Sequence, residues 1–170
     1  VKLDKTPPVV TINVPANGAE YILGEAIIAD WTVSDALSGI KTQQGTANNG
    51  AAIDTASAGE KSFQVSATDQ ADNSAASTHT YTVFSAVQAT ERLINSVTEA
   101  GLDPGQTNAL NQVLRNAVNS ANRGNTNAVT GQITAFINQV EAQRGKKIDS
   151  ETADQLISTA RKILVALTIR

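Results

Sequence analysis

Apolar residues in the first half of the chain alternate with polar ones. A period of two places one set of side chains on a single face of a half-buried strand. Turn-forming groups rich in Gly, Asn and Ser separate these segments, and several short strands at such spacing predict two packed antiparallel sheets. The alternating sets are Val10, Ile12 and Val14; Ile27, Ala29, Trp31 and Val33; Phe63, Val65 and Ala67; and Tyr81 and Val83.

In the second half of the chain the apolar spacing changes to three and four residues. This spacing puts each apolar stripe on one side of a helix, and four short amphipathic helices on short loops must bury their stripes against one another. The stripes are Leu93, Ile94 and Val97; Leu110, Val113, Leu114, Ala117 and Val118; Val129, Ile133, Phe136, Ile137 and Val140; and Leu156, Ile157, Ala160, Ile163, Leu164 and Leu167.

Residues at the expected helix ends have the chemistry of helix caps. We expect Pro104 at the first helical position of the second helix, behind Asp103. Asp149 can cap the fourth helix, while Ile148 packs back onto Ala153. Glycine, which readily adopts the left-handed conformation, is expected to end the first three helices, at Gly101, Gly124 and Gly145.

Two resemblances to known families accompany these patterns. Residues 4–83 resemble the bacterial immunoglobulin-like domains found in tandem on secreted and surface proteins, although Asp72 stands where that family usually has Gly. The matching segments are Asp4–Ile12 with its Thr-Pro-Pro, Tyr21–Gly24, Trp31–Gly39, Ala67–Asn73 with its Ala-Thr-Asp-x-Ala-x-Asn element, and Tyr81–Val83.

Residues 88–167 resemble the FIMAH type of C-terminal helical domain, through Ala135–Ile148 and Ala153–Ile157. The expected fold is therefore two domains, an all-β immunoglobulin-like sandwich over residues 1–85 and an all-α four-helix bundle over residues 86–170. The FIMAH resemblance implies an accessory tail on an exported bacterial protein, with no established activity of its own.

Composition limits the classes of function. The chain begins with Val1 and contains no Met, so we expect a processed or excised fragment of a larger protein. It has no Cys, and therefore no disulfide or thiolate metal site, and no apolar run approaches the length of a membrane span. Four Lys against nine acidic residues give residues 1–85 a charge of −5, and nine basic against seven acidic residues give residues 86–170 a charge of +2. Neither half has the basic character of a nucleic-acid partner.

The residues with reactive side chains do not predict catalysis. The single histidine, His79, falls at the edge of the last strand and is expected to be a partly buried structural residue. The acids of the helical half lie on polar faces or caps, and no glycine-rich phosphate loop is present. An amide crosslink from Lys41 or Lys61 would require an apolar setting that neither lysine has. We expect a non-catalytic protein.

Acidic residues at strand ends suggest a cation instead. Calcium takes six to eight hard oxygen ligands, which loops at one end of a pair of sheets can supply together. The alternative is that these residues only form turns, because Asp and Asn readily bond their own backbone. If calcium binds, we expect Asp69 and Asp72 among its ligands before Asp35; no cofactor is required otherwise. The candidate ligands are Asp4, Asp35, Asp69, Asp72 and Asn73.

These observations predict a spacer joined to a helical interaction module, secreted or at the bacterial cell surface, whose partner is the rest of the parent polypeptide. The alternative is a carbohydrate- or cell-wall-binding module, which would use exposed aromatic rings. Because Trp31 and Phe63 are assigned to the interior, Tyr21, Phe84 and Tyr81 remain for that role. A basic group at Arg144, Lys146 and Lys147 suggests either stabilisation of a helix end or contact with an acidic polysaccharide or wall polymer.

Overall fold

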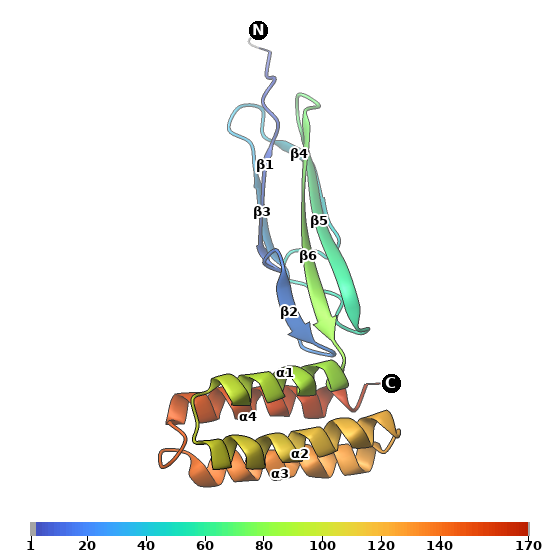
Figure 1. Cartoon of the computed structure of the whole chain (residues 1–170). Helices are drawn as coiled ribbons and strands as arrows, with labels where there is room; N and C mark the ends of the chain where they lie inside the picture. Colours follow the sequence, from blue (N-terminus) through green and yellow to red (C-terminus); the bar gives the residue numbers. More distant parts are fainter. Residues whose placement is uncertain (1–2, 170) are drawn as a thin grey trace. The chain divides into compact units, whose positions relative to one another are not determined.

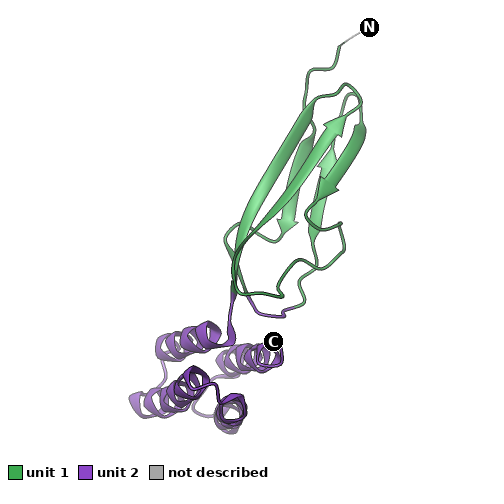
Figure 2. Cartoon of the chain, turned by 90° about the vertical axis from the view of Figure 1, so that its right-hand side faces the viewer, with its two compact units in different colours: residues 1–21, 26–83 green, residues 22–25, 84–170 purple. Residues whose placement is uncertain are grey.

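A computed structural model describes residues 3–169 of the chain. Contacts between backbone positions divide the chain into two compact units, coloured separately in Figure 2. The β-rich unit comprises residues 1–21 and 26–83, and the helical unit comprises residues 22–25 and 84–170. Each unit has an apolar interior of its own.

The β-rich unit is built from two sheets (Figure 1). One sheet pairs two strands in the order β1-β3, and the other has four strands in the order β2-β6-β5-β4. Adjacent strands pair antiparallel in β1 with β3, β4 with β5 and β5 with β6. The strands are β1 (Val9–Val14), β2 (Ala19–Ile22), β3 (Asp30–Ser34), β4 (Ile40–Gly45), β5 (Gly59–Asp69) and β6 (Ser74–Phe84).

The alternating apolar residues of the sequence fill the interior of this unit. Phe63 and Val65 of β5 and Val83 of β6 are almost completely buried. Trp31 is also buried, as its position in the alternation predicts, and its indole Nε1 donates a hydrogen bond to the Ala47 carbonyl oxygen at 3.2 Å. The strand pattern therefore predicts the interior correctly.

The expected fold class, two domains with an all-β immunoglobulin-like sandwich followed by an all-α bundle, is wrong. The β-rich part is small, with one sheet of only two strands. Residues 27–29 and 50–53 belong to no named strand: they meet in an isolated bridge between Ile28 and Ala52 and in a few backbone hydrogen bonds around it. In addition, residues 22–25 group with the helices rather than with the strands, so the chain does not divide into a sandwich and a bundle at residue 85.

Four helices form most of the second unit, as the change in apolar spacing predicts. They are α1 (Ala86–Glu99), α2 (Pro104–Asn122), α3 (Thr126–Gln143) and α4 (Ser150–Ala166). Asp103 caps α2 with Pro104 at its start, and Asp149 caps α4 by accepting a hydrogen bond from the Thr152 amide. The three glycines expected after α1, α2 and α3 all have positive φ angles of 67° to 71°.

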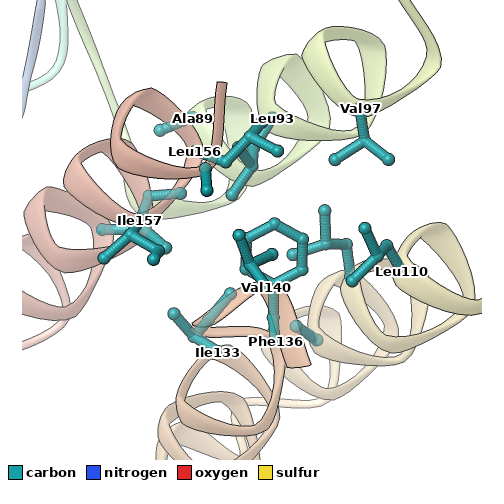
Figure 3. Packing of buried hydrophobic residues seen from close by; sticks show 14 of the residues in the cluster. Ala89, Leu93, Val97, Leu110, Ile133, Phe136, Val140, Leu156 and Ile157 are labelled. Atoms are coloured by element: carbon teal, nitrogen blue, oxygen red, sulfur yellow. The ribbon is translucent and has the colours of Figure 1, made fainter. Parts of the chain in front are cut away.

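The helices bury one continuous apolar interior, shown in Figure 3. Phe136 of α3 lies at its centre and is fully buried, with Leu93 of α1 and Ile163 of α4 in the same cluster. Ile148 and Ala153, expected to pack at the start of α4, are both fully buried members of this cluster. Ile22, from the end of β2, packs against it as a partly buried residue.

None of the helices in the described part of the chain combines the length and the hydrophobicity that a membrane-spanning segment requires.

Candidate metal centre

Three aspartates of the β-rich unit come together from distant parts of the sequence. Asp4 precedes β1, Asp35 follows β3, and Asp69 ends β5. One carboxylate oxygen from each lies within 4.8 Å of the other two. Three hard, anionic oxygens at this separation can serve as ligands of a divalent cation such as calcium.

Backbone N–H groups hold the Asp35 carboxylate in place. Its Oδ1 accepts hydrogen bonds from the amides of Ser38 and Gly39, both at 2.7 Å, and from Leu37 at 3.2 Å. The Gly39 N–H is the largest cause that lowers the pKa of Asp35 below its ordinary value of 3.8, and the Ser38 and Leu37 amides act in the same direction against an opposing effect of burial. Because all of these bonds fall on Oδ1, Oδ2 can meet a ligand.

Asp69 is fully buried and its carboxylate organises the turn between β5 and β6. Its Oδ1 accepts from the amides of Ala71 and Asn73 at 2.8 and 2.9 Å. Its Oδ2 accepts from Nδ2 of Asn73 at 2.8 Å. The Gln70 amide donates to the Gly39 carbonyl at 2.9 Å, which joins this turn to the one that holds Asp35. The two turns therefore fix two of the three carboxylates in one rigid frame.

Asp4 reaches this frame from the segment that precedes β1. Its Oδ1 accepts from the Thr6 amide at 2.9 Å, whereas its Oδ2 is buried and has no hydrogen-bond partner among residues 3–169. A buried carboxylate oxygen without a partner is costly, and the two neighbouring carboxylates add like-charge repulsion. A divalent cation at this point would satisfy the orphaned oxygen and offset the repulsion, so the residues present fit such an ion.

The other two candidates from the sequence, Asp72 and Asn73, lie at the same turn but play different parts. Asp72 has a positive φ angle of 66°, and its exposed side chain pairs with Nζ of Lys41 at 2.5 Å, outside the three-aspartate cluster. Asn73 uses its Nδ2 to approach the carbonyl oxygens of Asp4 and Thr6, at 3.4 and 3.5 Å, in addition to Asp69. The carboxylate beside Asp69 is therefore that of Asp35 rather than that of Asp72.

The remaining residues singled out in the sequence have structural contacts. Nδ1 of the partly buried His79 lies 2.8 Å from the Pro15 carbonyl oxygen. Tyr81 is buried with its hydroxyl donating to the Asp54 carbonyl, and its ring meets that of Tyr21 edge to face. Phe84 lies beneath the guanidinium of Arg92, 4.5 Å from the ring centroid. The three aromatic rings reserved for sugar binding are thus engaged within their own units.

Comparison with known proteins identifies the helical part. Residues 87–165 match the family model of the FIMAH domain. This match covers α2, α3 and nearly all of α1 and α4, and it supports the family assignment of the helical part of the chain. No curated protein and no solved structure matches the chain.

Proposed function

We propose that the chain is a non-catalytic accessory region of a larger exported bacterial protein, in which calcium stiffens the β-rich unit as a spacer and the helical unit serves as an interaction module. The observation that carries this proposal is the cluster of Asp4, Asp35 and Asp69 with its buried, unpartnered Asp4 Oδ2. The accessory role on an exported protein is the one that the FIMAH match to the helical part suggests.

The position of the cluster explains what an ion would do mechanically. Asp4 belongs to the segment before β1, whereas Asp35 and Asp69 belong to turns that the Gln70–Gly39 hydrogen bond already joins. A cation shared by the three side chains would fasten residues 4–6 to these turns. Calcium sites in extracellular modules have dissociation constants of about 10⁻⁴ to 10⁻³ M, so a site with few protein ligands suits the calcium concentration outside the cell.

Thermal unfolding with and without calcium tests this function. Trp31 is the only tryptophan and is buried in the β-rich unit, so its fluorescence follows that unit, while the far-ultraviolet circular dichroism signal at helical wavelengths follows α1 to α4. An ion bound only to the folded state raises the melting temperature. We expect calcium to raise, and a chelator to lower, the Trp31 transition. Identical Trp31 transitions in calcium and in chelator would contradict the proposal.

A matched pair of variants locates the effect. Asp69→Asn removes a buried carboxylate from the cluster and should abolish the calcium-dependent shift. Glu60→Gln removes one exposed negative charge from the other end of the same strand, β5, and should leave the shift unchanged. If both variants lost the calcium-dependent shift in melting temperature equally, calcium would act through the overall charge of the unit rather than at a site.

A further inference from the structure

The helical unit contains a polar cleft that none of the features above uses. It lies along the exposed face of α4 and the end of α3, with a volume of about 470 Å³. Residues 154, 158, 161 and 165 of α4 line it at helical spacing, over a length of about 17 Å. From the end of α3 and the residue after it, Glu141 and Arg144 complete the wall.

One cation in this cleft is not neutralised. Nη2 of Arg144 lies 2.7 Å from Asp154, and its Nη1 lies 3.8 Å from Glu141. Lys162 pairs with Glu25 at 2.5 Å. The guanidinium of Arg161, by contrast, has no hydrogen bond or ion pair with any residue in the described range 3–169. An exposed guanidinium that is free to form two parallel hydrogen bonds is suited to a carboxylate.

The acidic side chains of the cleft indicate what else the ligand must carry. Both oxygens of Asp154 contact Nη2 of Arg144, and one oxygen of Glu141 lies near Nη1. Both side chains are still 57% exposed, so the remaining lone pairs of their carboxylates can accept hydrogen bonds from hydroxyl groups. A polymer that carries carboxylates but no hydroxyl groups, such as polyglutamate, would leave these acceptors without partners. Val165, at the end of the cleft and 52% exposed, offers an apolar contact for the C–H face of a sugar ring.

We infer that this cleft binds an acidic polysaccharide, a chain of hydroxylated sugar rings that carry carboxylates, with Arg161 holding the carboxylate and Asp154 and Glu141 accepting from hydroxyls. The site is independent of the calcium cluster, because every lining residue belongs to the helical unit. Of the basic group expected at Arg144, Lys146 and Lys147, only Arg144 lines the cleft; Nζ of Lys146 instead donates to the Ala142 carbonyl at the end of α3.

Titration of the whole chain with a short oligogalacturonate, followed by calorimetry, tests the inference. The buffer contains a chelator, so that the result does not depend on calcium binding. We expect binding that weakens about tenfold to a hundredfold in Arg161→Ala, the range expected for a charge-assisted pair, and that is unchanged in Arg115→Ala, an exposed arginine of α2 outside the cleft. Circular dichroism verifies that each variant is folded, and Arg161→Gln replaces Arg161→Ala if that variant is not.

Two further probes decide the class of ligand. A neutral oligogalactose of the same length should bind more weakly than the oligogalacturonate, and so should polyglutamate. Absence of oligogalacturonate binding, or binding that Arg161→Ala leaves intact, would overturn the inference. Polyglutamate binding as strong as that of the oligogalacturonate would overturn the assignment to a polysaccharide and indicate an acidic peptide.

Discussion

Asp4 and Asp69 meet through their carboxylates although they lie near opposite ends of the β-rich unit in sequence, with an oxygen of each within 4.8 Å of the other. Asn73 links them further, because its Nδ2 donates to Asp69 Oδ2 at 2.8 Å and approaches the Asp4 carbonyl oxygen at 3.4 Å. Within the described part of the chain, Asp69 accepts three hydrogen bonds through its carboxylate, whereas Asp4 Oδ2 accepts none. The pair therefore combines a fixed carboxylate with an unsatisfied one.

The variant Asp4→Asn should lower the stability of the β-rich unit in calcium but not in chelator. Asparagine keeps an oxygen for the Thr6 amide but removes one of three clustered negative charges. In chelator, the variant should melt at the same temperature as the wild type or higher, because like-charge repulsion falls. In calcium it should melt lower, because a charged ligand is lost.

The measurement is the Trp31 fluorescence transition, with Glu60→Gln as the control for loss of a single charge. A lower melting temperature for Asp4→Asn under both conditions would show that Asp4 stabilises the fold by its hydrogen bond alone, and would contradict a cation site.

The turn at Asp72 gives a second prediction, concerning backbone conformation. Asp72 adopts a φ angle of 66°, which glycine tolerates freely and alanine does not. We expect Asp72→Gly to be more stable than Asp72→Ala by about 1 kcal/mol, since both lose the exposed pair with Lys41 and differ only in backbone freedom. Urea unfolding monitored by Trp31 fluorescence measures this difference. Equal stability of the two variants would show that the turn does not require the left-handed conformation.

The residue that caps α4, Asp149, predicts that the stability of the folded state depends on pH. Hydrogen bonds from Thr152, first from its side chain and then from its backbone amide, lower the pKa of Asp149 below the ordinary value of 3.8. A carboxylate with a lowered pKa stabilises the folded state above its ordinary pKa, and that contribution is lost as the pH falls through the folded-state value. Asp149→Asn keeps the capping oxygen but cannot ionise.

The wild type should therefore be more stable than Asp149→Asn near pH 7, and this advantage should decrease as the pH falls below 3.8 and disappear once the pH is below the folded-state pKa of Asp149. Melting curves recorded by circular dichroism across this range provide the comparison. An advantage that persists unchanged in acid would mean that the charge of Asp149 does not stabilise the helix.

The packing of the helical unit predicts that replacing one buried residue, Phe136, will lower its stability strongly. Phe136 is fully buried at the centre of the cluster, and its replacement by Ala should cost about 3–5 kcal/mol of stability. The control is Val165→Ala, at an α4 residue that is 52% exposed, for which a change within about 0.5 kcal/mol is expected. Urea unfolding monitored by circular dichroism distinguishes the two. A loss at Phe136 no larger than that at Val165 would contradict the packing described.

Local chemistry made the helical half predictable from sequence. The apolar stripes have a period that only a helix satisfies, and Asp103, Asp149 and the three glycines mark helix ends by hydrogen-bonding and backbone rules that act over a few residues. The alternation of apolar and polar residues around Phe63 and Trp31 is also a local property of the sequence, and it predicted correctly which residues are buried in the β-rich unit.

What sequence reasoning missed depends on contacts between distant residues. Strand β4 is polar along most of its length and forms through its backbone pairing with β5, so it carries no apolar alternation. Ile22–Glu25 groups with the helices, where Glu25 pairs with Lys162 and Ile22 packs against the apolar cluster. Neither contact can be recognised from the local spacing of apolar residues. The expectation of an immunoglobulin-like sandwich was therefore wrong.

Of the aspartates that the sequence suggests as metal ligands, the structure brings Asp4 and Asp35, but not Asp72, beside Asp69. Sequence proximity favoured Asp72 as the neighbour of Asp69, yet the positive φ angle at Asp72 accompanies a side chain directed to Lys41. Asp35 comes beside Asp69 because the Gly39 carbonyl bonds the Gln70 amide across two turns. A long-range backbone hydrogen bond of this kind cannot be inferred from spacing.

Calcium titration followed by two-dimensional amide NMR tests most directly whether the three aspartates bind an ion. We expect chemical-shift changes that saturate at one equivalent of calcium, are confined to Asp4–Thr6, residues 35–39 and residues 69–73, and are absent in Asp69→Asn. No change on addition of calcium, or changes spread over exposed acids throughout both units, would contradict a calcium site formed by Asp4, Asp35 and Asp69.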